Sequence, residues 1–391
     1  MKYNFDEKIV RLGTNAYKYD RLKEFCGSDD VTPMWVADMD FATPPFVLQA
    51  IQKRLSQQIL GYTCTTDAYY DSIVAWCQSH YDWTVTREQI SYVPGVVCGI
   101  YLAMQVFTEK GDKILIQDPV YHPFRIVPET SEREIVWNHL VRTEDSFEMD
   151  LEALRRDLKG CKMMILCNPH NPAGICWSRE TLQQVAHICA EEGVVVVSDE
   201  IHCDMLLDGR KHIPFATVSE EARRISITLQ APSKTFNMPG VVCSHAIIPN
   251  DEMREKYFYY IDESDMTLGN VFTYDCAAAC YSDEGDEWRK QMLEYVQGNV
   301  QALVEGLAPI QDKVRVIRPE ASFLVFLDCR GLGFTTAEEY MDFFANKCHL
   351  GLNPGNMFGP GGLGYMRMNV GCPRSLVDEA IACILKAVSE L

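Results

Sequence analysis

The sequence of 391 residues has no long apolar run and no closely paired cysteines. No stretch approaches the ~20 apolar residues that a membrane-spanning helix needs, so we predict no membrane segment. The sixteen cysteines are scattered without a C-x-x-C pair, and Cys276 and Cys280 have the wrong spacing for a zinc knuckle. We therefore predict no metal site and expect most cysteines to be small buried side chains in a reducing compartment.

Positive charge is also scarce, with 36 basic against 55 acidic residues and a formal net charge of -19. A chain of this charge repels polyanions, so we expect it to bind neither nucleic acid nor an anionic membrane, although a local pocket for a small anion remains compatible with it. Residues 1–20 carry no apolar core of the kind found in signal peptides. We expect a cytoplasmic protein.

Apolar residues, in contrast, make up 47% of the chain and fall into short runs through its middle. Four runs, at 113–117, 162–168, 194–200 and 224–234, resemble strands that are buried on both faces, as in a parallel sheet covered by helices. Residues 178–193 lie between two of them and combine a serine N-cap, helical spacing and a glycine stop. This alternation predicts an α/β fold with a large, doubly wound, mostly parallel sheet.

The pattern changes after about residue 285, where a long helix is followed by a predicted hairpin of antiparallel strands. A short helix, a Gly/Pro-rich loop, the strand "YMRMNV" and a closing helix complete the chain. We predict two domains: a large α/β domain at 46–285, and a smaller α+β domain formed by residues 1–45 together with 286–391.

Polar residues follow three of the predicted strands directly. They are Asn168, Asn171, Asp199, His202, Ser233 and Lys234. In open α/β sheets, ligands bind in the crevice beyond the carboxyl ends of the strands. These side chains are therefore predicted to converge on one site.

Lys234, in "APSKTFNMPG", is either a solvated loop lysine or an amine that forms a Schiff base once burial has deprotonated it. The order of the motifs favours the second interpretation. A strand-end Ser-Lys, Asp199 upstream of it, the earlier "NPAG" that begins at Asn171, and Arg367 near the C-terminus together resemble the pyridoxal-phosphate (PLP) enzymes of the class I/II aminotransferase fold. The resemblance implies fold type I and a Lys234 that carries PLP.

The resemblance also assigns roles around the cofactor ring. Asp199 is expected to keep the proton on the pyridine nitrogen, without which PLP is a poor electron sink. Asn171 is expected to bind the phenolic oxygen, and His202 stands where many members have a tyrosine that faces the same oxygen. Tyr121 in "DPVYHPF" is expected to stack on the ring.

The phosphate is expected at the start of a helix, where free backbone N–H groups bind anions. In "VPGVVCGIYLAMQVF" the N–H groups of Val96 and Val97 match this role, and the Ser233 hydroxyl is a further candidate. Many family members have an arginine at the position of Val242, so one usual phosphate ligand is missing here. Tyr62 resembles the tyrosine that reaches the phosphate of a neighbouring subunit, which implies a homodimer.

The substrate is expected to bind next to the cofactor. Arg367 resembles the family arginine that holds the α-carboxylate of an amino acid, a task for which the guanidinium fork is suited. Asn171, Tyr121 and Trp35 are expected to contribute to the same substrate site.

Three segments indicate a branch of the family: "MWVADMDFATPP" at 34–45, "SDEIHCD" at 198–204 and "APSKTFNMPG" at 231–240. Together they resemble the cystathionine β-lyase, or C–S lyase, branch (MalY/PatB type). The resemblance implies β-elimination from an amino-acid thioether, which yields a thiol, pyruvate and ammonia. The alternatives are an aminotransferase on the same fold and, ranked lower, a regulatory binding protein that retains the PLP site.

Overall fold

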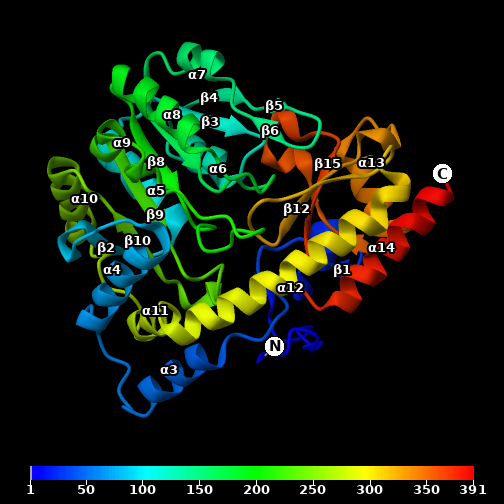
Figure 1. Cartoon of the computed structure of the whole chain (residues 1–391), viewed down its shortest axis with the longest axis horizontal. Coiled ribbons are helices and arrows are strands. Elements are labelled where there is room, and N and C mark those ends of the chain that lie inside the picture. The colour runs from blue at the N-terminus through cyan, green and yellow to red at the C-terminus, as the bar shows by residue number, and fades with distance from the viewer. Residues whose placement is uncertain (1) are drawn as a thin grey trace.

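The computed structural model describes residues 2–391 and is built around a seven-stranded sheet with strand order β2-β10-β9-β8-β7-β3-β4 (Figure 1). Its strands are β2 (Ile90–Val93), β3 (Lys113–Asp118), β4 (Glu134–His139), β7 (Cys161–Cys167), β8 (Val195–Asp199), β9 (Ser226–Gln230) and β10 (Ser244–Ile247). Strand β10 runs antiparallel to β9 and β2, and the other neighbouring pairs are parallel. The predicted mostly parallel α/β sheet is confirmed.

Both faces of this sheet are buried, and alternate residues of one strand enter different cores. Met164 and Val196 pack in a core with helices α7 (Leu151–Asp157) and α8 (Arg179–Glu191). Met163 and Val197 pack in another with α5 (Val96–Phe107), α6 (Pro123–Thr130) and α10 (Asp251–Glu263). Successive side chains of a strand point to opposite faces, which explains why these strands are apolar at almost every position.

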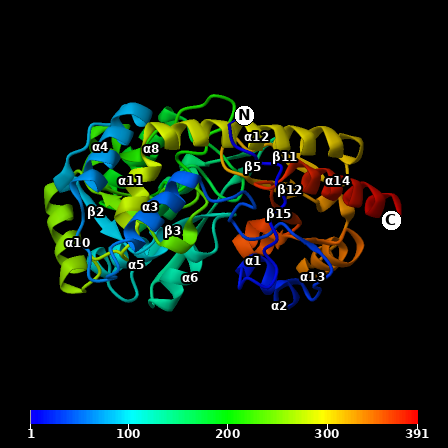
Figure 2. The ribbon, with the colours of Figure 1, turned by 90° about the horizontal axis from the view of Figure 1, so that it is seen from below.

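A second, antiparallel sheet has the order β11-β12-β15-β14. Its strands are β11 (Arg315–Ile317), β12 (Leu324–Asp328), β14 (Asn353–Pro354) and β15 (Tyr365–Asn369). The predicted hairpin is the pair of β11 and β12, and β15 pairs with β12. The long helix α12 (Asp283–Leu307) runs from the first sheet to this one and packs against the closing helix α14 (Arg374–Ser389) (Figures 1 and 2).

The N-terminal residues lie beside the C-terminal part of the chain (Figure 2). Strand β1 (Thr32–Pro33) pairs in parallel with β13 (Leu350–Gly351), and two short helices precede it. The remaining helices and strands are α1 (Tyr17–Asp20), α2 (Leu22–Cys26), α3 (Pro45–Leu55), α4 (Asp67–Tyr81), α9 (Glu220–Ile225), α11 (Thr273–Cys280), α13 (Ala337–Asp342), β5 (Val141–Arg142) and β6 (Phe147–Glu148).

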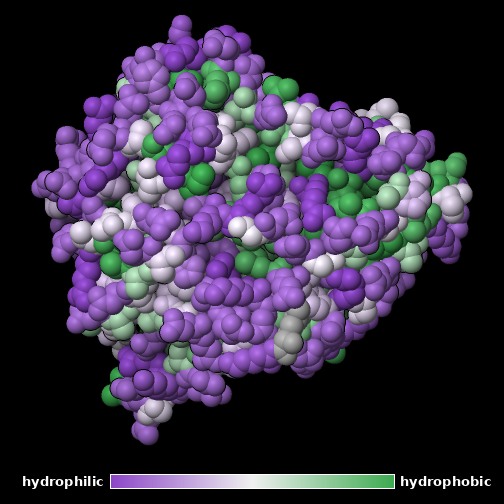
Figure 3. Space-filling model, in the orientation of Figure 1, coloured by the Kyte–Doolittle hydropathy of each residue, from purple (hydrophilic) through white to green (hydrophobic). Residues whose placement is uncertain are grey.

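The face of the molecule in Figure 3 is mainly hydrophilic, with smaller apolar areas between the polar side chains. This matches the strongly acidic composition of the chain. Across residues 2–391, none of the helices is both long enough and apolar enough to span a bilayer.

Candidate active site

A cavity of about 240 Å³ opens at the carboxyl ends of the parallel strands, where the sequence predicts a site. Eight of the predicted site residues line it together. They are Val96, Val97, Tyr121, Asn171, Asp199, His202, Ser233 and Lys234. Segments that lie far apart in the sequence meet here because β7, β8 and β9 are neighbours in the sheet and end at the same edge.

Lys234 follows β9 and is half-buried in the wall of this cavity. Its Nζ donates a hydrogen bond to the backbone oxygen of Ala37, at 2.9 Å. Burial lowers the pKa of the amine to about 8, against the opposing effect of the Asp38 charge. A fraction of Lys234 is therefore uncharged at neutral pH, which an exposed loop lysine would not be.

Asp199 is the last residue of β8 and is buried, with Oδ1 accepting a hydrogen bond from the Ile201 N–H at 3.1 Å. Burial raises the pKa of its carboxyl to about 7, and the neighbouring Glu200 charge acts in the same direction. A cation placed beside Asp199 would restore its ionised form. The residue is thus suited to a ligand that brings a positive charge.

His202 lies one turn beyond Asp199, and its imidazole is buried. Burial lowers the pKa of this ring to about 3, and the cations Lys234 and Arg367 add to the effect. Its Nδ1 has no hydrogen-bond partner among the described residues. A neutral ring with a free buried nitrogen has an unsatisfied capacity to bind a polar ligand atom.

The first turn of α5 supplies open backbone N–H groups to the cavity. Gly95 precedes the helix with φ of 104°, a conformation that favours glycine, and no side chain caps the helix. Val96, Val97 and Cys98 follow and all line the cavity. A helix start of this kind attracts anions through its N–H groups and its dipole.

Arg367 in β15 is buried just beyond Asn171. Its guanidinium donates to Asn171 Oδ1 at 3.0 Å, Asn353 Oδ1 at 2.8 Å and the Trp35 oxygen at 3.2 Å, and lies 4.8 Å from the ring centre of Phe358. Burial lowers its pKa to about 10, so it remains charged at neutral pH.

No carboxylate of residues 2–391 lies within 4.0 Å of this guanidinium, whereas many other arginines form ion pairs with carboxylates. All three of its acceptors are neutral oxygens. A buried cation is costly without an anionic partner. The site therefore has an unfilled requirement for an anion such as a carboxylate.

Tyr121 lines the cavity near Arg367, and its N–H donates to the Asn171 oxygen at 3.0 Å. Trp35 is placed differently, because its ring stacks on Phe25 with 3.8 Å between centroids and its Nε1 donates to the Lys18 oxygen. It meets Arg367 through its backbone oxygen. A contribution of the Trp35 ring to substrate binding stays a prediction.

Tyr62 is 100% exposed and does not line the cavity of its own chain. Its role, which was predicted for a neighbouring subunit, also stays a prediction. Val242 does line the cavity, and it adopts the left-handed φ of 55°, which is unusual for a β-branched residue. This position therefore gives the cavity wall an apolar side chain.

Two residues that the sequence did not single out contact the predicted ones. Ala37 accepts the hydrogen bond of Lys234, and Asn353 accepts one from Arg367. No local pattern marks either residue, since each contact joins segments distant in sequence. Over the described part of the chain, no group of three His, Cys, Asp or Glu side chains has the arrangement of a metal site.

Residues 29–384 match the family model described as aminotransferase class I and II, and the chain belongs to this family. Within it, cystathionine β-lyase PatB of Bacillus subtilis is 39% identical over 99% of this chain and 100% of its own. This relationship confirms the predicted resemblance to the cystathionine β-lyase branch.

Solved structures agree with this placement. Cystalysin from Treponema denticola, which contains a pyridoxal 5'-phosphate cofactor, has a TM-score of 0.95 and 29% identity, with 100% of both chains covered. The PLP-bound C–S lyase from Staphylococcus hominis has a TM-score of 0.91 and 30% identity, covering 98% of both chains.

Proposed function

We propose that this chain is a PLP-dependent carbon–sulfur lyase that releases a thiol, pyruvate and ammonia from a sulfur-containing amino acid by β-elimination. One observation carries the proposal most directly. Lys234, whose pKa is lowered to about 8, lines the cavity, and Arg367, a buried cation without a carboxylate partner, donates to Asn171 in the cavity wall. An amine-reactive cofactor and an amino-acid carboxylate are the ligands that these two groups require.

The residues of the cavity fit PLP on three grounds. The uncapped first turn of α5 suits a phosphate, as do the neighbouring hydroxyl of Ser233 and the Gly95 conformation. The raised pKa of Asp199 suits a carboxyl that awaits a protonated ring nitrogen. The unpartnered Nδ1 of His202 suits a polar ring substituent.

Each residue then has a distinct task. Bound PLP supplies the electron sink that makes the Cα proton of an amino acid acidic. Asp199 would keep the ring nitrogen protonated, Asn171 and His202 would bind the phenolic oxygen of the ring, and Tyr121 would cover the ring face. Lys234 Nζ, which the cavity holds partly uncharged, takes the Cα proton.

Arg367 binds the substrate α-carboxylate and orients Cα toward Lys234. Its present partner Asn171 also lines the cofactor cavity, so a carboxylate bound here lies beside the cofactor. The carboxylate would replace neutral oxygens around a buried cation with a charged partner, and charge-assisted bonds of this geometry are the strong ones. The thiolate leaves from the neighbouring carbon and takes up the proton that Lys234 removed, and the released 2-aminoacrylate reacts with water to give pyruvate and ammonia.

The decisive assay supplies L-cystathionine or L-cystine with no keto acid present. We expect continuous release of pyruvate, ammonia and a thiol or its persulfide over many turnovers. A reaction that stops after one turnover, leaves the cofactor as pyridoxamine phosphate and restarts only on addition of a keto acid would instead identify an aminotransferase.

A second copy of the chain would complete the site. Tyr62 lies in an exposed segment that also contains Ile59 and Leu60, whose side chains are 74% and 62% exposed. Contiguous exposed apolar residues are unusual on a free surface and are common where subunits meet. We propose a homodimer in which Tyr62 reaches the phosphate of the partner, and light scattering of the purified protein would measure its mass.

The predicted division into domains, at 46–285 and at 1–45 with 286–391, is part of the same proposal. Each part contains one of the two main sheets, and the site lies where they meet. A cytoplasmic location is likewise proposed, in keeping with sixteen cysteines that are all free thiols.

A further inference from the structure

The segment Met34–Phe41 forms a strap that crosses the site and has no regular secondary structure of its own. It contains "WVADMDF", which marked the branch of the family but has no task in the mechanism above. Every backbone oxygen from Met34 to Met39 accepts a hydrogen bond. Five of these six oxygens accept from side-chain groups, so specific tertiary contacts fix the position of this irregular segment.

The donors to the strap come from the two sides of the site. On the arginine side, Arg367 donates to the Trp35 oxygen, and Asn369 donates to the oxygens of Val36 and Asp38 at 2.6 and 2.7 Å. The lysine and arginine thus contact strap oxygens only two residues apart, at Ala37 and Trp35.

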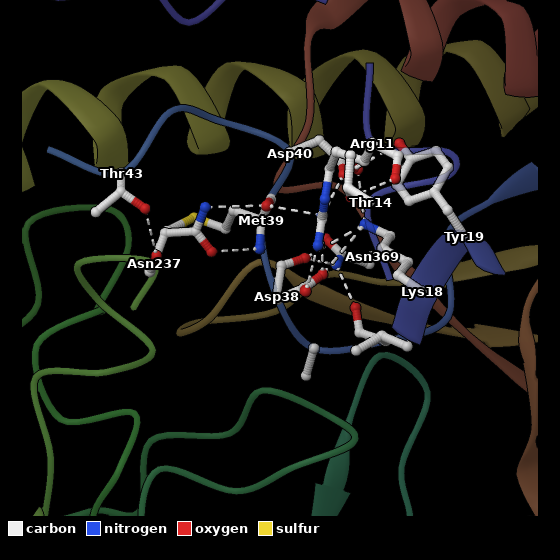
Figure 4. A network of polar contacts seen from close by, with 12 residues as sticks. Arg11, Thr14, Lys18, Tyr19, Asp38, Met39, Asp40, Thr43, Asn237 and Asn369 are labelled. Atoms are coloured by element: carbon white, nitrogen blue, oxygen red, sulfur yellow. Dashed lines mark hydrogen bonds and ion pairs between the residues drawn. The ribbon is translucent and has the colours of Figure 1, made fainter. Parts of the chain in front are cut away.

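On the lysine side, Asn237 binds the strap three times. It accepts from the Met39 N–H at 2.9 Å and donates to the Met39 oxygen at 3.0 Å (Figure 4). It also donates to the Phe41 oxygen, at 2.7 Å. Asn237 belongs to the same loop as Lys234. The strap is therefore hydrogen-bonded both to the lysine loop and to β15, and fixes their positions relative to each other.

A four-charge cluster made of Arg11, Lys18, Asp38 and Asp40 clamps the strap from its other side (Figure 4). Arg11 bridges Asp38 and Asp40, at 2.6 Å from each, while the fully buried Lys18 lies 2.7 Å from Asp40. Two cations and two carboxylates give the cluster no net charge.

We propose that this cluster is a positioning device for Lys234. Through the strap it holds the Ala37 oxygen against the lysine amine, and its cations balance the Asp38 charge that acts on that amine. The inference rests on the proposed role of Lys234. Arg11, Lys18, Asp38 and Asp40 are positioning residues, since the mechanism gives none of them contact with the reacting atoms.

The charged groups that act on Lys234 come from several elements. Asp38 of the strap and Asp199 at the end of β8 raise the pKa of the amine, whereas Arg367 of β15 lowers it, and His202 is neutral above about pH 3. Because the cluster is balanced, loss of one of its acids leaves it positive, and loss of one of its bases leaves it negative.

Two opposite substitutions test the inference. Asp38→Asn should lower the pKa of Lys234 and Arg11→Gln should raise it, each by about half a pH unit or more, and the double variant should lie near the wild type. Both side chains are partly exposed, at 17% and 20%, so each replacement leaves the buried Lys18–Asp40 pair intact. A merely structural role would shift both variants in the same direction.

The pKa is measured on the full chain freed of cofactor, by trace labelling with isotopic acetic anhydride from pH 6 to 10 and mass spectrometry of the Lys234 peptide. The surface pair Lys8–Glu379, at 2.9 Å and more than half exposed, provides matched controls. Lys8→Gln and Glu379→Gln remove the same charges elsewhere and should leave the Lys234 pKa unchanged.

Opposite shifts at Asp38→Asn and Arg11→Gln support the proposal, and shifts of one sign, or no shift, overturn it. If Asp38→Asn does not fold, the Lys234 pKa of Arg11→Gln is compared with that of its control Lys8→Gln. The proposal then requires a raised pKa in Arg11→Gln and an unchanged pKa in Lys8→Gln. Failure of the proposed function is distinguishable, since it would appear as wild-type protein that gains no visible absorbance with PLP.

Discussion

The lysine side and the arginine side of the site are built in different ways. Asp199 ends β8, and His202 and Lys234 follow β8 and β9 in one mostly parallel sheet, so their proximity is a property of that sheet. Arg367 lies within a strand of the other sheet and reaches the site only through Asn171, Asn353 and the strap. The cofactor half is therefore a product of one sheet, whereas the substrate half depends on how separate parts of the chain pack.

The largest expected effect is on the lysine side. Lys234→Ala should abolish the visible absorbance of the protein with PLP and all lyase activity, because no other amine lines the cavity as described. Absorbance spectra and pyruvate release measure this. Lys211→Ala, at an exposed lysine, is the control and should change neither. A Lys234→Ala protein with the wild-type spectrum would contradict the assignment.

Arg367→Ala should have the next largest effect. It removes a charge-assisted bidentate contact, so KM should rise steeply and kcat fall, with a loss of roughly a hundredfold in kcat/KM. The visible spectrum should remain, since the cofactor half is intact. Arg367→Lys keeps the charge without the fork and should lie between. An Arg367→Ala enzyme within about threefold of the wild type would show that substrate binds elsewhere.

Asp199→Asn separates stability from function. The pKa of Asp199 is raised from 3.8 to about 7 in the folded protein, so keeping this carboxyl ionised in the fold lowers the free energy of unfolding. This destabilisation is absent below about pH 4, grows as the pH rises, and is complete above about pH 7. The cofactor-free variant should match the wild type near pH 4 and be more stable at pH 8, by on the order of 1–3 kcal/mol, while losing most lyase activity.

Thermal unfolding of both proteins at several pH values measures this difference. Asp145→Asn, at an exposed carboxylate, is the matched control and should show no growth of the difference with pH. A variant that is less stable than the wild type at pH 8 would mean that the carboxylate stabilises the fold, contrary to its burial.

Tyr62→Phe should have the smallest effect. If Tyr62 reaches the phosphate of a partner subunit, loss of its hydroxyl removes one hydrogen bond among several, and PLP affinity should fall by a few-fold to about tenfold. Titration of the cofactor-free protein with PLP measures this. Tyr259→Phe, at a tyrosine that is 66% exposed, should leave the affinity unchanged. An active monomer with unchanged affinity would overturn the shared site.

Local pattern predicted the sheet well because each of its strands carries its own signal. The apolar runs before Asn168, Asp199 and Lys234 correspond to β7, β8 and β9, and the Ser178 cap begins α8. The resemblance added Arg367, which no local pattern distinguishes from an ordinary strand arginine. Neither the local pattern nor the resemblance predicted the contact of Ala37 with Lys234 or the position of the Trp35 ring.

By itself, the sequence determined the order and type of the main elements, the family, and the residues at the strand ends, because periodicity, caps and short motifs act between near neighbours. Only the tertiary structure decided the electrostatic state of the site. The lowered pKa of Lys234, the raised pKa of Asp199 and the unpaired charge of Arg367 all arise from burial and from partners far away in the chain. Desolvation is a property of the packed molecule, and no single segment carries it.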